Sequence, residues 1–312
     1  MTYRYSKDHI GTQHYDEFFR NLDAHGWKTA MDRLMTLQDI IKPQKISMFL
    51  SDQRRNDFIF LLPLGEESVV LDYGSGWGNT TFTLAPYCKQ VVAMEADHGR
   101  LRFSAAHFAH RGVYNVTPVR SGNALSLPFR DNSFDAVIMN GVLEWTPRSI
   151  NGPPEEVHKQ VLTEVRRVLK SNGTLQISIE NRFGYAYLLG KRDHHCGGLR
   201  WAPFLPRPLA NLYSWLWLRQ PYRTWFYSYG RLREVISGAG FGDTQIYSYF
   251  HNHVRYSHMY LLDDEANVSR KAHEILANQR VTWKDRLAYR LGCRLRQFRW
   301  IAQDFMVVTK KN

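Results

Sequence analysis

A glycine-rich turn between two apolar strands constrains the fold of this chain more than any other feature. Residues 69–79 read Val-Val-Leu-Asp-Tyr-Gly-Ser-Gly-Trp-Gly-Asn, and a second apolar run, 91–95, ends on Glu95. The glycines allow a sharp turn and a close approach of the backbone to a ligand. An acid about 20 residues further on, at the end of the next parallel strand, can accept hydrogen bonds from ribose hydroxyls. The pair therefore predicts a site for a nucleoside-containing cofactor.

Strand and helix signals alternate regularly through the first half of the chain. Five β-rich runs are separated by helical lengths, at 69–73, 91–95, 113–118, 134–140 and 174–180. The helix predicted over 155–169 places its valines and leucines on one face, at 157, 161, 162, 165 and 169. This succession predicts an α/β fold: a Rossmann-like, doubly wound and mostly parallel sheet with helices on both faces.

Composition divides the 312 residues further. Broken helical patterning before the first strand predicts an N-terminal helical cover over residues 1–60. The core is assigned to 61–182 and 231–312. Between them, 183–230 are assigned to an aromatic and basic insertion on the acceptor side. From Asp193 to Glu234 the chain has no further acid but six arginines and many aromatics. Its segment 209–218 is apolar nearly all round, which indicates burial, a partner interface or contact with lipid.

Positive charge is concentrated at the end of the chain. The net charge is +12, and residues 270–312 hold eleven Lys or Arg against three acids, so 11 − 3 = +8 of it lies there. Within that stretch, apolar residues at spacings of four, four and three predict an amphipathic helix with a basic outer face: Leu287, Leu291, Leu295 and Phe298. Two interpretations remain open, a helix packed on the core and a contact with phosphate or lipid headgroups.

Several classes of protein are disfavoured. No apolar run approaches the ~20 residues that span a bilayer, and residues 1–20 lack the apolar centre of a signal peptide. We expect a cytoplasmic protein, and the basic tail extends that expectation to the inner face of the membrane. The three cysteines are scattered and fit neither a disulfide framework nor zinc ligation, and no metal is expected.

The segment from Val69 to Glu180 resembles the class I methyltransferases that use S-adenosyl-L-methionine (SAM). Residues 71–78 resemble their motif I, 123–129 followed by 132–137 resemble the segment that leads into strand four, and 169–173 resemble the turn before strand five. The resemblance implies a seven-strand sheet. It also implies SAM contacts from Asp72, Gly74, Ser75, Gly76, Glu95, Asn123, Ala124 and Asn140.

A nicotinamide dehydrogenase is the main competitor for the glycine turn. The spacing here is Gly-x-Gly-x-Gly-Asn, so Asn79 occupies the position of the third glycine in the dinucleotide fingerprint. Together with the later motifs, this favours SAM. A methyltransferase-like domain that binds SAM without catalysis, or serves as a membrane scaffold, stays open as a different class of function.

The acceptor is less defined than the donor. Enzymes that methylate base amino groups commonly carry Asn-Pro-Pro-Tyr after strand four, where this chain has Asn-Gly-Val-Leu. An RNA or small-metabolite acceptor remains an alternative. Residues 179–195 are similar to bacterial SAM methyltransferases associated with glycosyltransferases of surface polysaccharides. That similarity implies O-methylation of a sugar hydroxyl on a glycan or on a lipid-linked or nucleotide-linked precursor.

A sugar hydroxyl is a poor nucleophile near neutral pH, so a base must lie within hydrogen-bond reach of it. The candidate catalytic residues are His194, His195 and Glu144, with Asn181 directly after strand five as a group that positions the acceptor. Asp193 and Glu180 are further candidates for the base.

Overall fold

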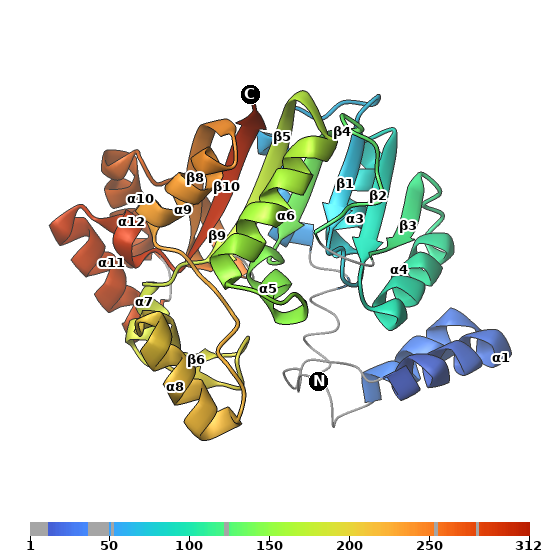
Figure 1. The fold of residues 1–312 in the computed structure, drawn as a ribbon, viewed down its shortest axis with the longest axis horizontal. Coiled ribbons are helices and arrows are strands. Elements are labelled where there is room, and N and C mark those ends of the chain that lie inside the picture. The colour runs from blue at the N-terminus through green and yellow to red at the C-terminus, as the bar shows by residue number, and fades with distance from the viewer. Residues whose placement is uncertain (1–11, 37–49, 51–52, 122–124, 253–254, 279–280) are drawn as a thin grey trace. The chain divides into compact units, whose positions relative to one another are not determined.

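The computed structural model describes residues 12–36, 50, 53–121, 125–252, 255–278 and 281–312 (Figure 1). The chain divides into two compact units, residues 1–122 and 123–312, called here the first and the second unit. Each is described by itself.

The first unit is a three-stranded parallel sheet with helices, in the order β3-β2-β1. Its elements are α1 (Thr12–Thr36), η1 (Gln53–Leu61), β1 (Val69–Tyr73), α3 (Asn79–Leu84), η2 (Ala85–Tyr87), β2 (Gln90–Glu95), α4 (His98–His110) and β3 (Val116–Arg120). The sequence predicted the third strand three residues too early. Val113 instead closes the end of α4, because its backbone N–H donates to the Phe108 carbonyl at 2.9 Å.

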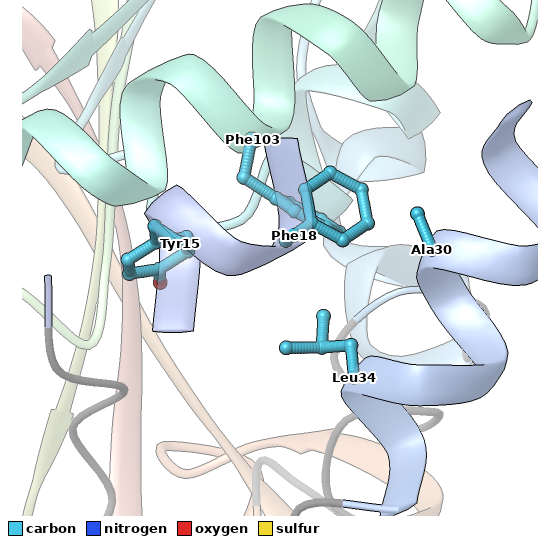
Figure 2. Close-up of a cluster of buried hydrophobic side chains, with 5 residues drawn as sticks. All are labelled: Tyr15, Phe18, Ala30, Leu34 and Phe103. Carbon is cyan, nitrogen blue, oxygen red and sulfur yellow. The ribbon is translucent and has the colours of Figure 1, made fainter. Parts of the chain in front are cut away.

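The helix α1 bends at Gly26, whose φ is 78°, and packs on α4. Figure 2 shows the buried side chains at this contact: Tyr15, Phe18, Ala30 and Leu34 from α1 and Phe103 from α4. The Trp77 indole N–H, on the glycine turn, donates to the Tyr15 hydroxyl at 3.0 Å. The N-terminal helix is therefore fixed to the glycine turn as well as to α4.

The second unit holds a mixed sheet in the order β4-β5-β10-β8-β9, with β4 and β5 parallel and the remaining pairs antiparallel. Its strands are β4 (Phe134–Asn140), β5 (Leu169–Glu180), β8 (Phe241–Asn252), β9 (Arg255–Leu261) and β10 (Asp304–Lys311), with a separate hairpin of β6 (Arg192–Asp193) and β7 (Leu199–Arg200). The edge strand β9 was not predicted from the sequence.

Helices cover this sheet and extend from it (Figure 1). They are η3 (Leu143–Trp145), α5 (Thr146–Ser149), α6 (Pro154–Val168), α7 (Tyr185–Leu188), η4 (Ala202–Phe204), α8 (Arg207–Leu218), α9 (Tyr229–Gly238), α10 (Glu265–Asn278), α11 (Trp283–Leu295) and α12 (Phe298–Ile301). The predicted apolar face of α6 is confirmed, because Val157, Val161, Leu162 and Val165 are all buried.

The amphipathic helix predicted near the end of the chain is present as α11, but its leucines are not the packed face. Leu287, Leu291 and Leu295 are 52%, 44% and 55% exposed. Only Phe298, in α12, is buried. The helix packs through smaller and mixed residues instead, namely Asp285, Ala288, Tyr289 and Gly292. The apolar row of α11 therefore faces outward.

Candidate functional site

The turn after β1 has the left-handed backbone that its glycines predicted. Gly74, Gly76 and Gly78 have φ of 77°, 58° and 84°, a region that side chains with a Cβ rarely adopt. A Cβ on Gly78 would lie 2.5 Å from the Phe108 ring, so that glycine is required for packing of α4. A Cβ on Gly76 would meet nothing within 4 Å, so the backbone there borders open space. Gly76 is the point where a ligand can approach.

Glu95 at the end of β2 joins the turn to the start of α4. Its Oε2 accepts a hydrogen bond from the Gly76 N–H at 2.8 Å, and its Oε1 accepts from the Asp97 N–H at 2.9 Å. Each carboxylate oxygen has a second lone pair, so the pair of oxygens can still accept two hydroxyl hydrogens. The side chain is therefore held in position beside the open surface at Gly76.

Two further polar groups of the turn are buried. The Asp72 Oδ2 accepts from the Thr81 hydroxyl at 2.5 Å. Burial, with a smaller contribution from Glu95, raises the pKa of Asp72 to about 7, although the Thr81 hydrogen bond opposes this. Among the described residues, the buried Ser75 hydroxyl has no hydrogen-bond partner. An unsatisfied buried hydroxyl costs about 1–3 kcal/mol, which a ligand contact would recover. These groups fit a small polar, cationic ligand.

The other predicted cofactor residues lie elsewhere. Asn140 ends β4 in the second unit, opposite Ser178 of β5. Asn123 and Ala124 lie outside the described residues. Their contacts with SAM stay predictions.

The second unit brings the predicted acceptor-side residues together around His195. This ring is buried, and its Nδ1 lies 3.2 Å from Asp193 Oδ1 and 3.8 Å from Glu180 Oε2. Its Nε2 lies 3.7 Å from Glu144 Oε1. The three carboxylates come from η3, β5 and β6, so the fold gathers residues that are up to 51 positions apart. We call Glu144, Glu180, Asp193, His194 and His195 the acid–histidine cluster.

The carboxylates favour the protonated form of His195. Burial alone would lower the pKa of this ring, but the hydrogen bond to Asp193 and the fields of Glu180 and Glu144 outweigh it, so the pKa is raised above its ordinary value. The ring is too deeply buried to meet a substrate directly.

His194 is the exposed member of the cluster. Its ring centroid lies 3.9 Å from that of His195. Loss of hydration where the ring contacts protein, followed by repulsion from His195, lowers the pKa of His194 to about 4. The residue is nevertheless exposed to solvent. His194 is therefore neutral at pH 7 and has a nitrogen lone pair that can accept a proton.

Sequence reasoning assigned no role to three residues that support the cluster. The Tyr222 hydroxyl donates to Asp193 Oδ2 at 2.8 Å, the Tyr187 hydroxyl donates to Glu180 Oε2, and Lys191 Nζ donates to Glu180 Oε1 at 2.9 Å. Tyr187 and Lys191 lie within the segment singled out from the sequence, but no local signal pointed to Tyr222.

Glu180, His194 and His195 also offer ligand atoms within 4.8 Å of one another. A metal ion there would have to compete with Lys191 and Tyr187 for the Glu180 oxygens. The arrangement suits the holding of protons better than the holding of a cation.

Asn181 makes contacts within the protein. Its amide N–H groups donate to the carbonyls of Ala302 at 2.7 Å and Trp300 at 3.2 Å, and its oxygen accepts from the Phe183 N–H at 2.9 Å. These bonds hold the loop after β5 against α12 and the residues between α12 and β10. A role of Asn181 in positioning the acceptor stays a prediction.

Comparison with known proteins identifies the fold that carries this turn. Residues 71–177, from β1 to β5, match the family model described as a methyltransferase domain. This segment is a class I SAM-dependent methyltransferase domain. The α/β, Rossmann-like fold expected from the sequence is confirmed, and SAM is the methyl donor of this class.

Relatives of the methyltransferase domain match different lengths of this chain. The uncharacterized methyltransferase YcgJ of Bacillus subtilis is 35% identical over 107 residues, 34% of this chain and 38% of that protein. A demethylmenaquinone methyltransferase of Geobacillus stearothermophilus is 28% identical over 200 residues, 62% of this chain and 80% of that protein. The chain spans about two fifths of the first curated relatives it matches.

Among solved structures, a putative sarcosine dimethylglycine methyltransferase from Galdieria sulphuraria is similar with a TM-score of 0.49 at 15% identity, covering 95% of this chain and 98% of that one. YcgJ from Bacillus subtilis is similar with a TM-score of 0.46 at 16% identity, covering 84% and 99%.

We expect the affinity of the methyltransferase domain for SAM to rise with pH through the pKa of Asp72. SAM carries a sulfonium cation, which favours the ionised carboxylate. Below the pKa of about 7, binding must first remove a proton from Asp72, so the affinity should fall by up to about tenfold per pH unit. Calorimetry over a pH series measures this, and Asp72→Asn should remove the dependence. A wild-type affinity that does not change with pH would contradict the assignment.

Proposed function

We propose that the chain transfers the methyl group of SAM to a hydroxyl of a small-molecule acceptor, a sugar on a glycan or on a lipid-linked or nucleotide-linked precursor. The observation that carries the proposal is the acid–histidine cluster, which places a neutral, exposed histidine over three buried carboxylates. Such a cluster suits an acceptor that must lose a proton, as a hydroxyl must.

The donor side is assigned to the first unit. Bound SAM supplies an electrophilic methyl group on its sulfonium. Glu95 would accept hydrogen bonds from the ribose hydroxyls, Gly76 would leave room for the ligand, and the Ser75 hydroxyl and Asp72 would meet its polar groups. The open surface at Gly76 and the unsatisfied Ser75 hydroxyl support this fit.

The acceptor side is assigned to His194. An acceptor hydroxyl must lose its proton when it takes up the methyl group, and a ring nitrogen of His194 would accept that proton. Protonated His195 opposes a second charge on His194, whereas Glu180 and Asp193 favour it. The three carboxylates of the cluster carry three formal negative charges, and protonated His195 with the neighbouring Lys191 carries two positive charges. One further proton on His194 would make the formal charge of the group zero.

We expect His194→Gln to lower kcat by about 10²–10⁴, the range for loss of a general base, with little change in the Kd for SAM. The matched control is His273→Gln, which changes an exposed histidine on α10. Radiolabelled methyl transfer measures kcat, and calorimetry measures binding. If His194→Gln retains the wild-type kcat at saturating acceptor, His194 is not the base.

The acceptor class is tested with labelled SAM offered to nucleotide sugars, lipid extract and RNA in parallel. The proposal expects label on nucleotide sugars or in the lipid fraction, from which mild acid hydrolysis releases it into water as a methylated sugar. Label confined to RNA would overturn it. SAM binding without label in any fraction would favour the non-catalytic alternative.

A second candidate acceptor is favoured by the relatives. A demethylmenaquinone methyltransferase matches 200 residues of this chain, well beyond the 107 residues of the family model. A quinone acceptor of that kind would keep its label in the organic phase after acid hydrolysis, which separates it from a lipid-linked sugar.

A further inference from the structure

The outward face of α11 carries a continuous apolar row. Trp283, Leu287, Leu291 and Leu295 follow one another at intervals of four and are 66%, 52%, 44% and 55% exposed. Side chains four apart lie on the same side of a helix, so the four form one stripe along the surface. A solvent-exposed helix normally directs such a stripe inward. This one therefore needs a partner.

A row of cations lies beside the apolar row. Arg286, Arg290 and Arg294 repeat at the same interval of four, each one position before a leucine. The acid of this helix, Asp285, is 9% exposed and points inward, where it forms a capping box with Thr282 and accepts a hydrogen bond from the Tyr185 hydroxyl. The accessible face of α11 therefore presents leucines and arginines without an acid.

A second exposed apolar helix belongs to the same unit. On α8, the five large side chains Leu209, Leu212, Trp215, Leu216 and Trp217 are between 51% and 68% exposed, whereas the small residues Ala210 and Ser214 are buried. The helix thus rests on the protein through its small side and turns its bulk outward. Burial of these large apolar side chains against a partner would be favourable.

Hydrogen bonds connect the region between the two helices. Lys284 Nζ, at the start of α11, donates to the Leu189 carbonyl at 3.1 Å, directly after α7. The exposed Trp201, just before η4 and α8, donates through its Nε1 to the Leu188 carbonyl at 3.4 Å. In Figure 1, α7 accordingly lies between gold α8 and red-orange α11. The exposed faces of α8 and α11, with Leu188 and Trp201, are called here the apolar–basic surface.

We propose that the apolar–basic surface docks on a lipid bilayer that carries anionic headgroups. In-plane binding combines apolar side chains at the acyl boundary with Lys or Arg at the headgroups and tryptophan at the interface between them. Each arginine near an anionic leaflet contributes roughly 1 kcal/mol. A second copy meeting this surface face to face would place arginine rows against one another, and like charges repel. Among the described residues, no helix is both long and apolar enough to cross a bilayer.

The test is flotation of the full chain with vesicles of phosphatidylcholine alone or mixed with phosphatidylglycerol. We expect binding to the anionic vesicles only. The double variant Leu287→Gln/Leu291→Gln should weaken it at least tenfold, and Arg290→Gln/Arg294→Gln roughly 30-fold, as expected for two arginine contributions. Because these side chains are exposed, circular dichroism should be unchanged. Matched controls are Phe60→Gln, an exposed apolar residue of the first unit, and Lys159→Gln on α6.

Brominated lipid in the same vesicles tests α8 separately. Docking on these vesicles should quench the tryptophan fluorescence of the chain. The quenching should be smaller for the variant Trp217→Phe than for the wild type. Unchanged binding of both double variants would overturn the proposal. Loss of vesicle binding in the arginine variant alone would also overturn it. That result would mean that the arginines adsorb to the charged headgroups while the leucines stay outside the bilayer. A stable dimer in light scattering that Leu287→Gln/Leu291→Gln dissociates would assign the surface to a second copy instead.

Discussion

Glu95→Ala is expected to weaken SAM binding by a factor of about 10² to 10⁴. Two hydrogen bonds from ribose hydroxyls to a carboxylate are lost, each worth about 1.5–3 kcal/mol. The substitution also removes the acceptor of the Gly76 and Asp97 N–H groups, at 2.8 and 2.9 Å, so the turn loses its attachment to α4. Both effects act in the same direction.

Glu67→Ala is the control for this experiment. Glu67 is an exposed acid of the same unit, paired on the surface with Lys89 at 2.6 Å, and such pairs contribute about 0–1 kcal/mol. Titration calorimetry with SAM gives the affinities, and circular dichroism checks that the fold persists. A Kd for Glu95→Ala within threefold of wild type would remove Glu95 from the cofactor site.

Asp193→Ala is expected to lower the free energy of unfolding by about 3–5 kcal/mol at pH 6. Removing one partner of a buried ion pair leaves the other charge unsatisfied. Here Asp193 accepts from the His195 backbone N–H at 2.9 Å, from its ring and from the Tyr222 hydroxyl, and all three lose their acceptor. Denaturant unfolding measures the loss. Asp131→Ala, which removes an exposed partner of Arg167, should cost less than about 1 kcal/mol.

The pH dependence of the cost of Asp193→Ala distinguishes the Asp193–His195 ion pair from the packing of the Asp193 side chain. The pKa of His195 is raised in the folded protein, so its stabilising contribution is complete below the unfolded value of about 6.5 and is lost as the pH rises through the folded value. The cost of Asp193→Ala should therefore shrink as the pH increases above 6.5. A cost that stays constant up to pH 9 would show that the charge on His195 does not matter.

The elements that depend on residues close together in the sequence were predicted correctly. The strand and glycine turn at 69–79 depend on backbone preferences of consecutive residues, and α6 depends on a spacing within one helix. The third strand was placed too early because a capping hydrogen bond at Val113, which no apolar pattern reveals, extends the end of α4.

The orientation of α11 could not be predicted from residue spacing. Spacing identifies which residues share a side of a helix, but the side that meets the core depends on what the neighbouring elements accept. At α11 the buried face consists of Asp285, Ala288, Tyr289 and Gly292, and the leucines are left outside. The same holds for α8, which rests on Ala210 and Ser214.

The cluster was predicted only in part for a related reason. All five members were candidates from the sequence: Glu144 and Glu180 because they follow strands, and Asp193, His194 and His195 because they lie in the segment after strand five. The hydrogen bond from Tyr222 to Asp193 was not predicted. The two residues are 29 positions apart, and a sequence pattern does not show which residues meet across such a separation. The predicted contacts of Asn123, Ala124 and Asn140 with SAM stay predictions.

Tyr222 also has a consequence for how the molecule responds to its surroundings. Its backbone N–H donates to the Asn211 side chain on α8 at 3.1 Å, while its hydroxyl holds Asp193. Two hydrogen bonds thus connect an outward-facing helix to the carboxylate that sets the charge of His195. One tyrosine thus anchors the seat of α8 with its backbone and the partner of His195 with its side chain, so a substitution at Tyr222 would disturb both.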